Sequence, residues 1–76
     1  MSRQYIKEIK RLAREAELDL VEHQDGRVVI LGGLQMVTWW PYSRRMTAYA
    51  DKAPRGVRFA MPRTVIAMAN GAGEQP

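Results

Sequence analysis

The feature that most constrains the fold is the Asp25-Gly26 pair, which stands between two apolar runs in the segment LDLVEHQDGRVVIL. Asp-Gly is a favoured two-residue hairpin turn, because both residues can adopt a positive φ. A two-residue turn fixes which residues face each other across the hairpin: Gln24 and Arg27, His23 and Val28, Val21 and Ile30, and Leu20 and Leu31. The segment therefore predicts two antiparallel strands in that register.

A third strand is predicted directly after this hairpin. Gly32-Gly33 forms the second turn, and the strand runs from Leu34 to Trp40, where Pro41 ends it because proline cannot donate to the ladder. Side chains alternate between the two faces of a strand. The alternation gives two sets, Met36, Thr38 and Trp40 on one face and Gln35, Val37 and Trp39 on the other. One Trp is therefore expected in the core and the other away from it.

The remaining strands are predicted between residues 41 and 60. The segment PYSRR forms a third turn before a fourth strand, Met46 to Ala50. The segment DKAPRG follows as an irregular loop, because it contains both proline and glycine. Residues 57–60 are predicted to form a short extended segment. The sheet is thus expected to contain three to four antiparallel strands.

Helices are predicted at both ends of the chain. Between Arg3 and about Glu17, apolar residues recur at spacings of three and four, with Ser2 as the N-cap: Ile6, Ile9, Leu12, Ala13 and Ala16. Acidic residues gather at the end of this helix, where they oppose its dipole, and so predict that it ends before Leu18. A second helix is predicted from Pro62 to Asn70, with Gly71 as its C-terminal cap.

The order α-β-β-β-β-α predicts an α+β fold in which two helices cover one face of a small antiparallel sheet. With 76 residues, the chain has room for one domain, which we expect over residues 1–71, with residues 72–76 as a disordered tail. An exposed sheet edge would also allow a homodimer.

Composition narrows the class of protein. The chain has no Cys, its N-terminus lacks the apolar core of a signal peptide, and no apolar run reaches the ~20 residues that cross a bilayer. We therefore expect a cytoplasmic protein that does not bind membranes. The net charge is +4, and residues 27–76 carry seven Lys or Arg against Asp51 and Glu74. This charge favours polyanions or acidic protein surfaces as partners. The alternative is that the charge serves only to keep the protein soluble.

Catalytic and metal-binding patterns are weak in this sequence. His23 is the single histidine, and Glu22 should point to the opposite face of its strand, so no partner orients the ring as a general base. Ser43 has no base near it in the sequence. One His, no Cys and scattered carboxylates give no ligand spacing for a metal. We therefore predict a protein that is not an enzyme and holds no cofactor.

The segment QMVTWWPYSRRMTAYA, residues 35–50, gathers aromatic and guanidinium groups around one turn. Such groups stack on bases and contact phosphates, and they also form the hot spots of protein interfaces. The predicted binding residues come from this turn, from the basic face of the first helix and from later arginines: Lys7, Lys10, Arg11, Arg14, Trp39, Trp40, Tyr42, Arg44, Arg45, Arg55 and Arg58. Arg63 could widen the patch. The alternative is structural, with one Trp and Tyr49 in the core and the arginines solvated.

The pattern Trp-Trp-Pro-Tyr-Ser-x-x-x-Thr-Ala-Tyr, residues 39–49, resembles a pattern in small bacteriophage and prophage proteins. This resemblance implies an accessory protein that binds host machinery or nucleic acid. The predicted order of elements is similar to the double-stranded-RNA-binding-domain fold, which RNA-cleaving toxins of the HicA type also use. In those toxins an early-strand histidine is catalytic and usually follows Gly-Ser, whereas His23 follows Val21-Glu22.

The leading hypothesis is a phage-encoded, non-enzymatic protein that binds DNA or RNA. Its basic helix and the Arg44-Arg45 turn would contact phosphates. The second hypothesis is an inhibitor that docks on a host protein, such as a defence complex or a polymerase, through Trp39, Trp40 and Tyr42. A HicA-like ribonuclease that uses His23 is the third.

Overall fold

Two helices and one antiparallel sheet make up the part of the chain that the computed structural model describes, residues 2–51 and 53–71, without the side chains of residues 2, 3 and 53–55. The elements follow in the order α1 (Ser2–Glu15), β1 (Asp19–Glu22), β2 (Val28–Leu31), β3 (Val37–Trp39), β4 (Ala48–Ala50), β5 (Ala53–Val57) and α2 (Pro62–Ala69). The predicted α+β class is confirmed. The predicted tail, residues 72–76, lies outside the described residues.

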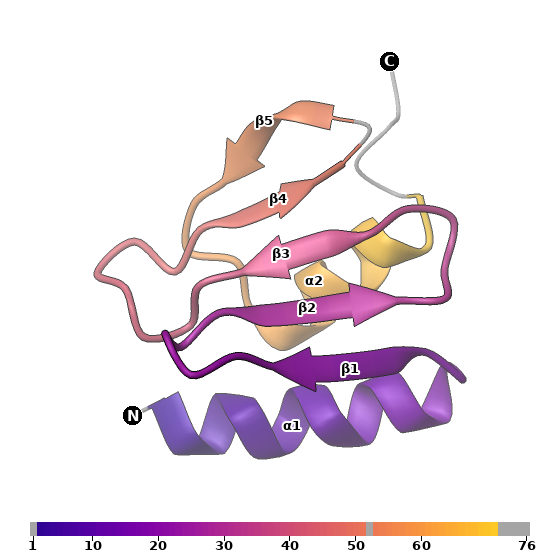
Figure 1. Cartoon of the computed structure of the whole chain (residues 1–76), viewed down its shortest axis with the longest axis horizontal. Coiled ribbons are helices and arrows are strands. Elements are labelled where there is room, and N and C mark those ends of the chain that lie inside the picture. The colour runs from indigo at the N-terminus through magenta and orange to yellow at the C-terminus, as the bar shows by residue number, and fades with distance from the viewer. Residues whose placement is uncertain (1, 52, 72–76) are drawn as a thin grey trace.

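The five strands lie in sequential order, β1-β2-β3-β4-β5, and every neighbouring pair is antiparallel. In Figure 1, α2 lies behind the sheet, and α1 runs alongside β1 at the edge. The core forms between the helices and the face of the sheet that they cover. Its large side chains have almost no exposed surface: Ile9, Ile30, Val37, Trp39 and Val65. The second face of the sheet carries no helix among the described residues. We call it the open face.

The predicted register of the first hairpin was wrong by one residue. Leu20 lies opposite Ile30 and Val21 opposite Val29. The turn has three residues, because the His23 amide donates to the Arg27 carbonyl at 2.8 Å, and the third turn residue, Gly26, has a φ of 94°. A type I turn followed by a left-handed residue is the usual three-residue hairpin loop. The shift turns Leu20 toward the helices and leaves Val21 on the open face.

Residues 53–56, which were predicted to belong to an irregular loop, form most of a fifth strand instead. β5 pairs with β4 through Ala48 opposite Val57 and Ala50 opposite Ala53, with an irregularity between them. Pro54 is tolerated because β5 is the last strand of the sheet, and an edge strand has one side without ladder bonds. Gly56 leaves room for the ring of Tyr49, since a Cβ atom at Gly56 would lie 2.6 Å from Tyr49 Cε1.

Helix α2 begins at Pro62 as predicted, and Gly71 follows its C-cap, Asn70, with a φ of 93°. The loop between β2 and β3 binds the end of this helix. The Leu34 amide donates to the Ala69 carbonyl at 2.8 Å, and Gln35 Nε2 donates to the Met68 carbonyl at 2.6 Å. These bonds satisfy carbonyls that the end of a helix leaves without partners. The loop therefore holds α2 against the sheet.

Gly33→Ala should destabilise the protein, because the new Cβ atom would lie 2.4 Å from the Ala69 carbonyl oxygen. The loop or the end of α2 must then shift, and the hydrogen bonds between them weaken. We expect the free energy of unfolding, measured with urea, to fall by about 3 kcal/mol. Gly32→Ala is the matched control, because its Cβ atom has ordinary space and only its φ of 91° is unfavourable. The control should lose about 1 kcal/mol. A Gly33→Ala protein as stable as the parent would contradict this docking.

Helix α1 ends at Glu15, before Leu18 as predicted, and its end forms a Schellman motif. The Leu18 amide donates to the Ala13 carbonyl at 2.8 Å, and the Glu17 amide donates to the Arg14 carbonyl at 3.1 Å. The motif requires a left-handed residue, and Glu17 adopts a φ of 60°. Glycine usually occupies this position because a side chain there has a steric cost.

Glu17→Gly should stabilise the protein. Glycine adopts the left-handed conformation without steric cost, and the substitution also removes a carboxylate from the negative end of the helix dipole. Together these two gains exceed the loss of stability that comes from the greater conformational freedom of glycine in the unfolded chain. We expect the free energy of unfolding to rise by about 1 kcal/mol, which corresponds to a rise in Tm of ~5 °C for a domain of this size. Glu15→Gly is the control, because this residue is helical and pairs with Arg11 at 3.0 Å. It should lower the Tm, and a lower Tm for Glu17→Gly would contradict the prediction.

Candidate functional site

The two adjacent tryptophans lie on opposite faces of β3, as alternation predicts. Trp39 is fully buried, and its Nε1 donates to the Ala60 carbonyl at 3.0 Å. Trp40 is half-buried on the open face. The prediction that Trp39 contacts a partner is therefore wrong, because its indole ring fills the core and its one hydrogen-bond donor is occupied. Trp40 is the tryptophan that a partner can reach.

A row of side chains crosses the open face at the level of Trp40. The Trp40 amide donates to the Thr47 carbonyl at 2.9 Å, so these residues continue the pairing of β3 with β4. On the other side, the register of β2 and β3 places Arg27 beside Trp40, and the Arg27 guanidinium lies 5.9 Å from the centre of the Trp40 ring. This distance is within the range of a cation–π interaction. Arg27 therefore holds the Trp40 ring in place.

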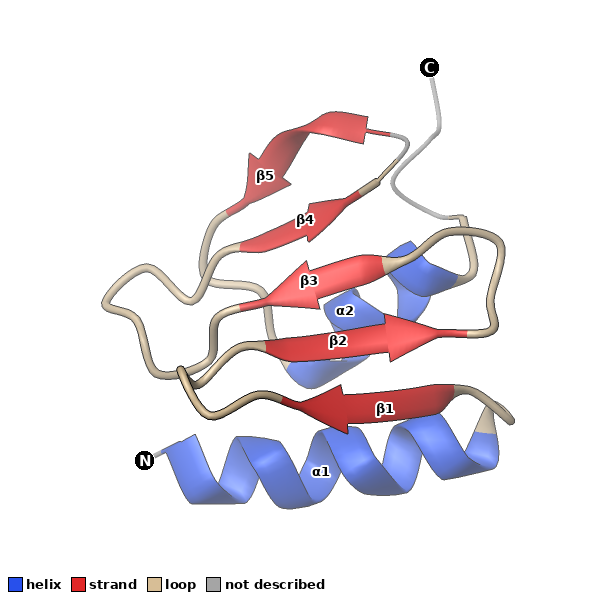
Figure 2. Cartoon of the chain, viewed as in Figure 1, coloured by secondary structure: helices blue, strands red, loops and turns tan. Residues whose placement is uncertain are grey.

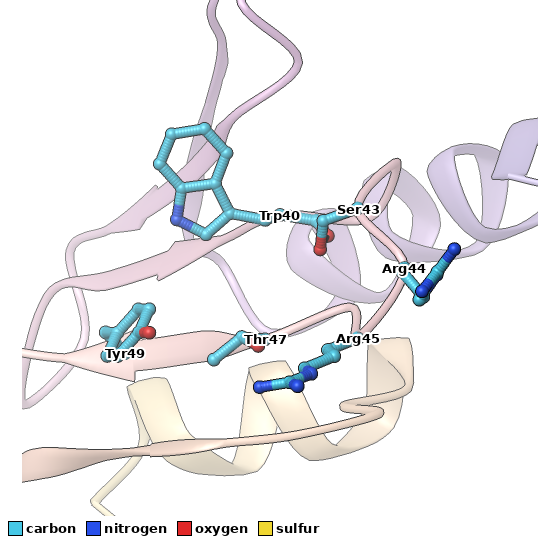
Figure 3. Close-up of a pocket in the computed structure, with 6 residues that line it drawn as sticks. All are labelled: Trp40, Ser43, Arg44, Arg45, Thr47 and Tyr49. Carbon is cyan, nitrogen blue, oxygen red and sulfur yellow. Dashed lines mark hydrogen bonds between the residues drawn. The ribbon is translucent and has the colours of Figure 1, made fainter.

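A hollow of about 600 Å³ opens next to Trp40, between the end of β3 and the beginning of β4. Its lining comes from the two strands and the turn between them: Trp40, Ser43, Arg44, Arg45, Thr47 and Tyr49 (Figure 3). In this view Arg45 lies along β4 beside Thr47, whereas Arg44 points away from the strands. Tyr49 is 47% exposed, so its ring is available to a partner. We call this the Trp40–Tyr49 hollow.

The turn that carries the two arginines is fixed by hydrogen bonds. Ser43 Oγ donates to the Trp40 carbonyl at 2.9 Å, and Met46 reverses the chain with a φ of 45°. The segment after β5 supports the turn from the other side, because the amides of Phe59 and Ala60 donate to the carbonyls of Arg45 and Met46. The arginines thus project from a fixed loop.

Three loops meet at this end of the molecule, those between β1 and β2, between β3 and β4, and between β5 and α2 (Figure 2). The Tyr42 ring contacts the first loop, since a Cβ atom at Gly26 would lie 3.2 Å from Tyr42 Cδ2. Tyr42 is nevertheless 57% exposed. It therefore joins two loops beside the hollow and does not line the hollow itself.

The arginines around the hollow are not neutralised by the described part of the chain. Among the side chains that the structure describes, no carboxylate pairs with Arg44, Arg45 or Arg58. Arg45 and Arg58 line a second, adjoining hollow of about 360 Å³ with Tyr49. A guanidinium group without a carboxylate is free to bind phosphate or an acidic side chain. The hollow is therefore a positively charged site.

The basic residues of α1 lie apart from this site. Lys10 pairs with Glu22 at 2.9 Å, and Arg11 pairs with Glu15 at 3.0 Å. Lys7 and Arg14 are exposed on the same helix, which runs along β1 (Figure 1). Tyr49 lies on β4, which is next to β5 at the opposite side of the sheet, and Arg45 lies in the turn that leads into β4. The structure therefore does not bring the predicted helix residues together with the predicted turn.

Two further predicted residues, Arg55 and Arg63, are not among the described lining residues of the hollow. The side chain of Arg55 lies outside the described part of the structure. Arg63 is exposed on α2, which lies behind the sheet, so it does not widen the open-face patch. The predicted turn residues that do meet at the hollow are Trp40, Arg44 and Arg45, and Arg58 lines its neighbour.

Sequence reasoning missed Thr47 and Tyr49 as lining residues and placed Tyr49 in the core as one alternative. The signal was available in the triplet Ala-Tyr-Ala at residues 48–50. Ala48 and Ala50 are buried, so alternation turns Tyr49 to the open face. Small alanines fit beneath a helix, where a Tyr ring would not. Arg27 was also missed, because its position beside Trp40 depends on the register between β2 and β3, which was not predicted.

His23 lies on the exposed hairpin, and its Nδ1 is 3.4 Å from an Arg27 guanidinium nitrogen. Within the described residues no carboxylate hydrogen-bonds to its ring, and no cluster of His, Asp or Glu could hold a metal ion.

No helix in the described part of the chain is both long and apolar enough to cross a bilayer. Comparisons with protein-family models, curated proteins and solved structures found no significant match.

Proposed function

We propose that this protein binds nucleic acid through the Trp40–Tyr49 hollow and that it does so without catalysing a reaction. The observation that carries the proposal is the combination of two aromatic side chains on the open face, the half-buried Trp40 and the exposed Tyr49, with three arginines that pair with no carboxylate in the described structure. Aromatic rings bind bases or sugars, and guanidinium groups bind phosphates. A cytoplasmic, phage-encoded accessory protein would suit this activity.

Arg44, Arg45 and Arg58 are the groups that we assign to phosphates. The Arg44 and Arg45 side chains project from a loop that is held by hydrogen bonds on both sides. Such a loop presents charge in a fixed place, so fewer conformations are lost on binding. The net charge of +4 adds long-range attraction for a polyanion.

A second candidate function is inhibition of a host protein. Three exposed apolar side chains lie on or beside the same loops: Tyr42, Phe59 and Met61. Exposed aromatic residues next to arginines are typical of protein-binding hot spots. A homodimer through a sheet edge also stays a prediction, although Pro54 in β5 disfavours strand pairing there. A ribonuclease that uses His23 has less support, because the group beside its ring is an arginine.

The salt dependence of binding tests the proposal. Labelled DNA and RNA oligonucleotides should bind at about 50 mM salt and weaken steeply by about 200 mM, as measured by fluorescence anisotropy. The slope of log affinity against log salt is negative, and each lost phosphate contact makes it less steep by about 0.7 to 0.9. Arg44→Ala with Arg45→Ala should therefore reduce its steepness by about 1.4 to 1.8.

Lys7→Ala with Arg14→Ala is the matched control, because it removes the same charge from exposed residues outside the hollow. This double variant should leave the slope nearly unchanged. If the control flattened the slope as much as the arginine pair, the assigned site would be wrong. An absence of binding to every oligonucleotide at the lower salt would contradict the proposed function itself.

A further inference from the structure

We infer that the hollow takes single-stranded nucleic acid, with one base on the Trp40 ring and a neighbouring base on the Tyr49 ring. This inference rests on the proposed function and specifies its substrate class. It comes from three features of the open face, which are the spacing of the two rings, the residues that hold each ring and the position of the arginines.

The spacing of the rings suits separated bases. Trp40 lies opposite Thr47, and Tyr49 is two residues farther along β4 on the same face. The Cα atoms of diagonal neighbours of this kind are about 7–8 Å apart in a sheet, and the two rings rise from positions with this spacing. Successive nucleotides of a stacked strand rise by about 3.4 Å, roughly half that distance. Neighbouring bases must therefore leave their stack to cover both rings, and an unpaired strand does this most easily.

The surface between the rings is low and polar. Thr47 follows the turn beside Trp40, and Thr38 lies opposite Tyr49 on the adjacent strand. Threonine side chains are short, so they leave the faces of larger neighbouring rings accessible. Their hydroxyl groups can donate to or accept from base edges. A duplex hides its base faces within the stack, whereas a single strand exposes them. A flat sheet face of this kind therefore favours a single strand.

Both rings are held by neighbouring residues. The Arg27 guanidinium stands over the Trp40 ring, and Arg27 is itself placed 3.8 Å from Asp25 Oδ1 and 3.4 Å from His23 Nδ1. The Tyr49 ring rests on Gly56, where any Cβ atom would overlap it. Each ring is thus held in position before a base arrives. Such preorganisation reduces the entropy that is lost on binding.

The arginines lie where the strand's phosphates would run. Arg45 lines both the Trp40–Tyr49 hollow and the adjoining one, and Arg58 lines the latter beside Tyr49. A strand whose bases cover Trp40 and Tyr49 therefore passes positive charge along its length. The basic residues of α1, of which Lys10 and Arg11 are ion-paired, lie at the other edge of the sheet (Figure 1), so they do not extend the row of arginines beside the two rings.

The first test compares strands with duplexes. Labelled DNA and RNA single strands of about 10 nucleotides, within the range of known single-strand sites, are titrated beside duplexes of the same sequence at about 50 mM salt. We expect at least tenfold tighter binding of one of the single strands. Equal or tighter binding of duplex that still depends on Arg44 and Arg45 would overturn this inference and leave the proposed function standing. No binding of any of them would overturn both.

The second test removes the rings one at a time. Tyr49→Leu keeps an apolar cover over Gly56 but loses the aromatic face, and it should weaken single-strand binding about 5- to 150-fold. The control is Val21→Ala, which changes an exposed side chain of the open face on the far strand β1, outside both hollows, and should bind as the parent does. Circular dichroism confirms that each variant is folded. A folded Tyr49→Leu protein with unchanged affinity would overturn the inference.

The third test uses the fluorescence of the two tryptophans. Trp39 is buried, so quenching of emission by a stacked base must come from Trp40. Trp40→Phe leaves Trp39 as the one tryptophan, so the quenching should disappear at oligonucleotide concentrations that saturate this variant, as followed by anisotropy. Quenching that persists in the Trp40→Phe protein would overturn the placement of a base on this ring.

Discussion

The burial of Trp39 is the constraint on which the rest of the structure depends. Its ring fills the space between the sheet and α2, and its Nε1 bonds to the Ala60 carbonyl, which fixes the segment that leads into that helix. Because neighbouring side chains alternate, a buried Trp39 places Trp40 on the open face. The same bonded segment contacts the turn of Arg44 and Arg45. One core residue therefore positions the aromatic and basic parts of the proposed site.

Placing both helices away from the open face divides the molecule by role. The face that the helices cover provides the core of a small domain. Every apolar side chain of this core matters for stability, because a small domain buries little surface. The open face carries partly exposed residues that add little to the core, such as Tyr49 and Arg45. These residues can be used for binding at a small loss of stability. The cost of the site falls instead on the arginine turn and on the segment after β5 that contacts it, where Met46 and Phe59 adopt left-handed conformations.

Periodicity and alternation predicted most of the fold, including both helices and the opposite faces of Trp39 and Trp40. The errors came from features that depend on tertiary contacts. The Asp25-Gly26 pair does not specify whether its turn has two or three residues, and the residues 53–57 pair with β4 despite Pro54 and Gly56. For the site, the turn arginines were predictable. Their separation from the helix cations required knowing where α1 packs.

The central claim is that the open face around Trp40 is where nucleic acid binds. A heteronuclear NMR titration with an unlabelled oligonucleotide tests it most directly, because each tryptophan has its own indole N–H resonance. We predict that the Trp40 indole and the amides of residues 43–49 shift on binding, while the Trp39 indole, bonded to Ala60, stays in place. Shifts confined to α1, or to the Tyr42, Phe59 and Met61 surface, would contradict the account.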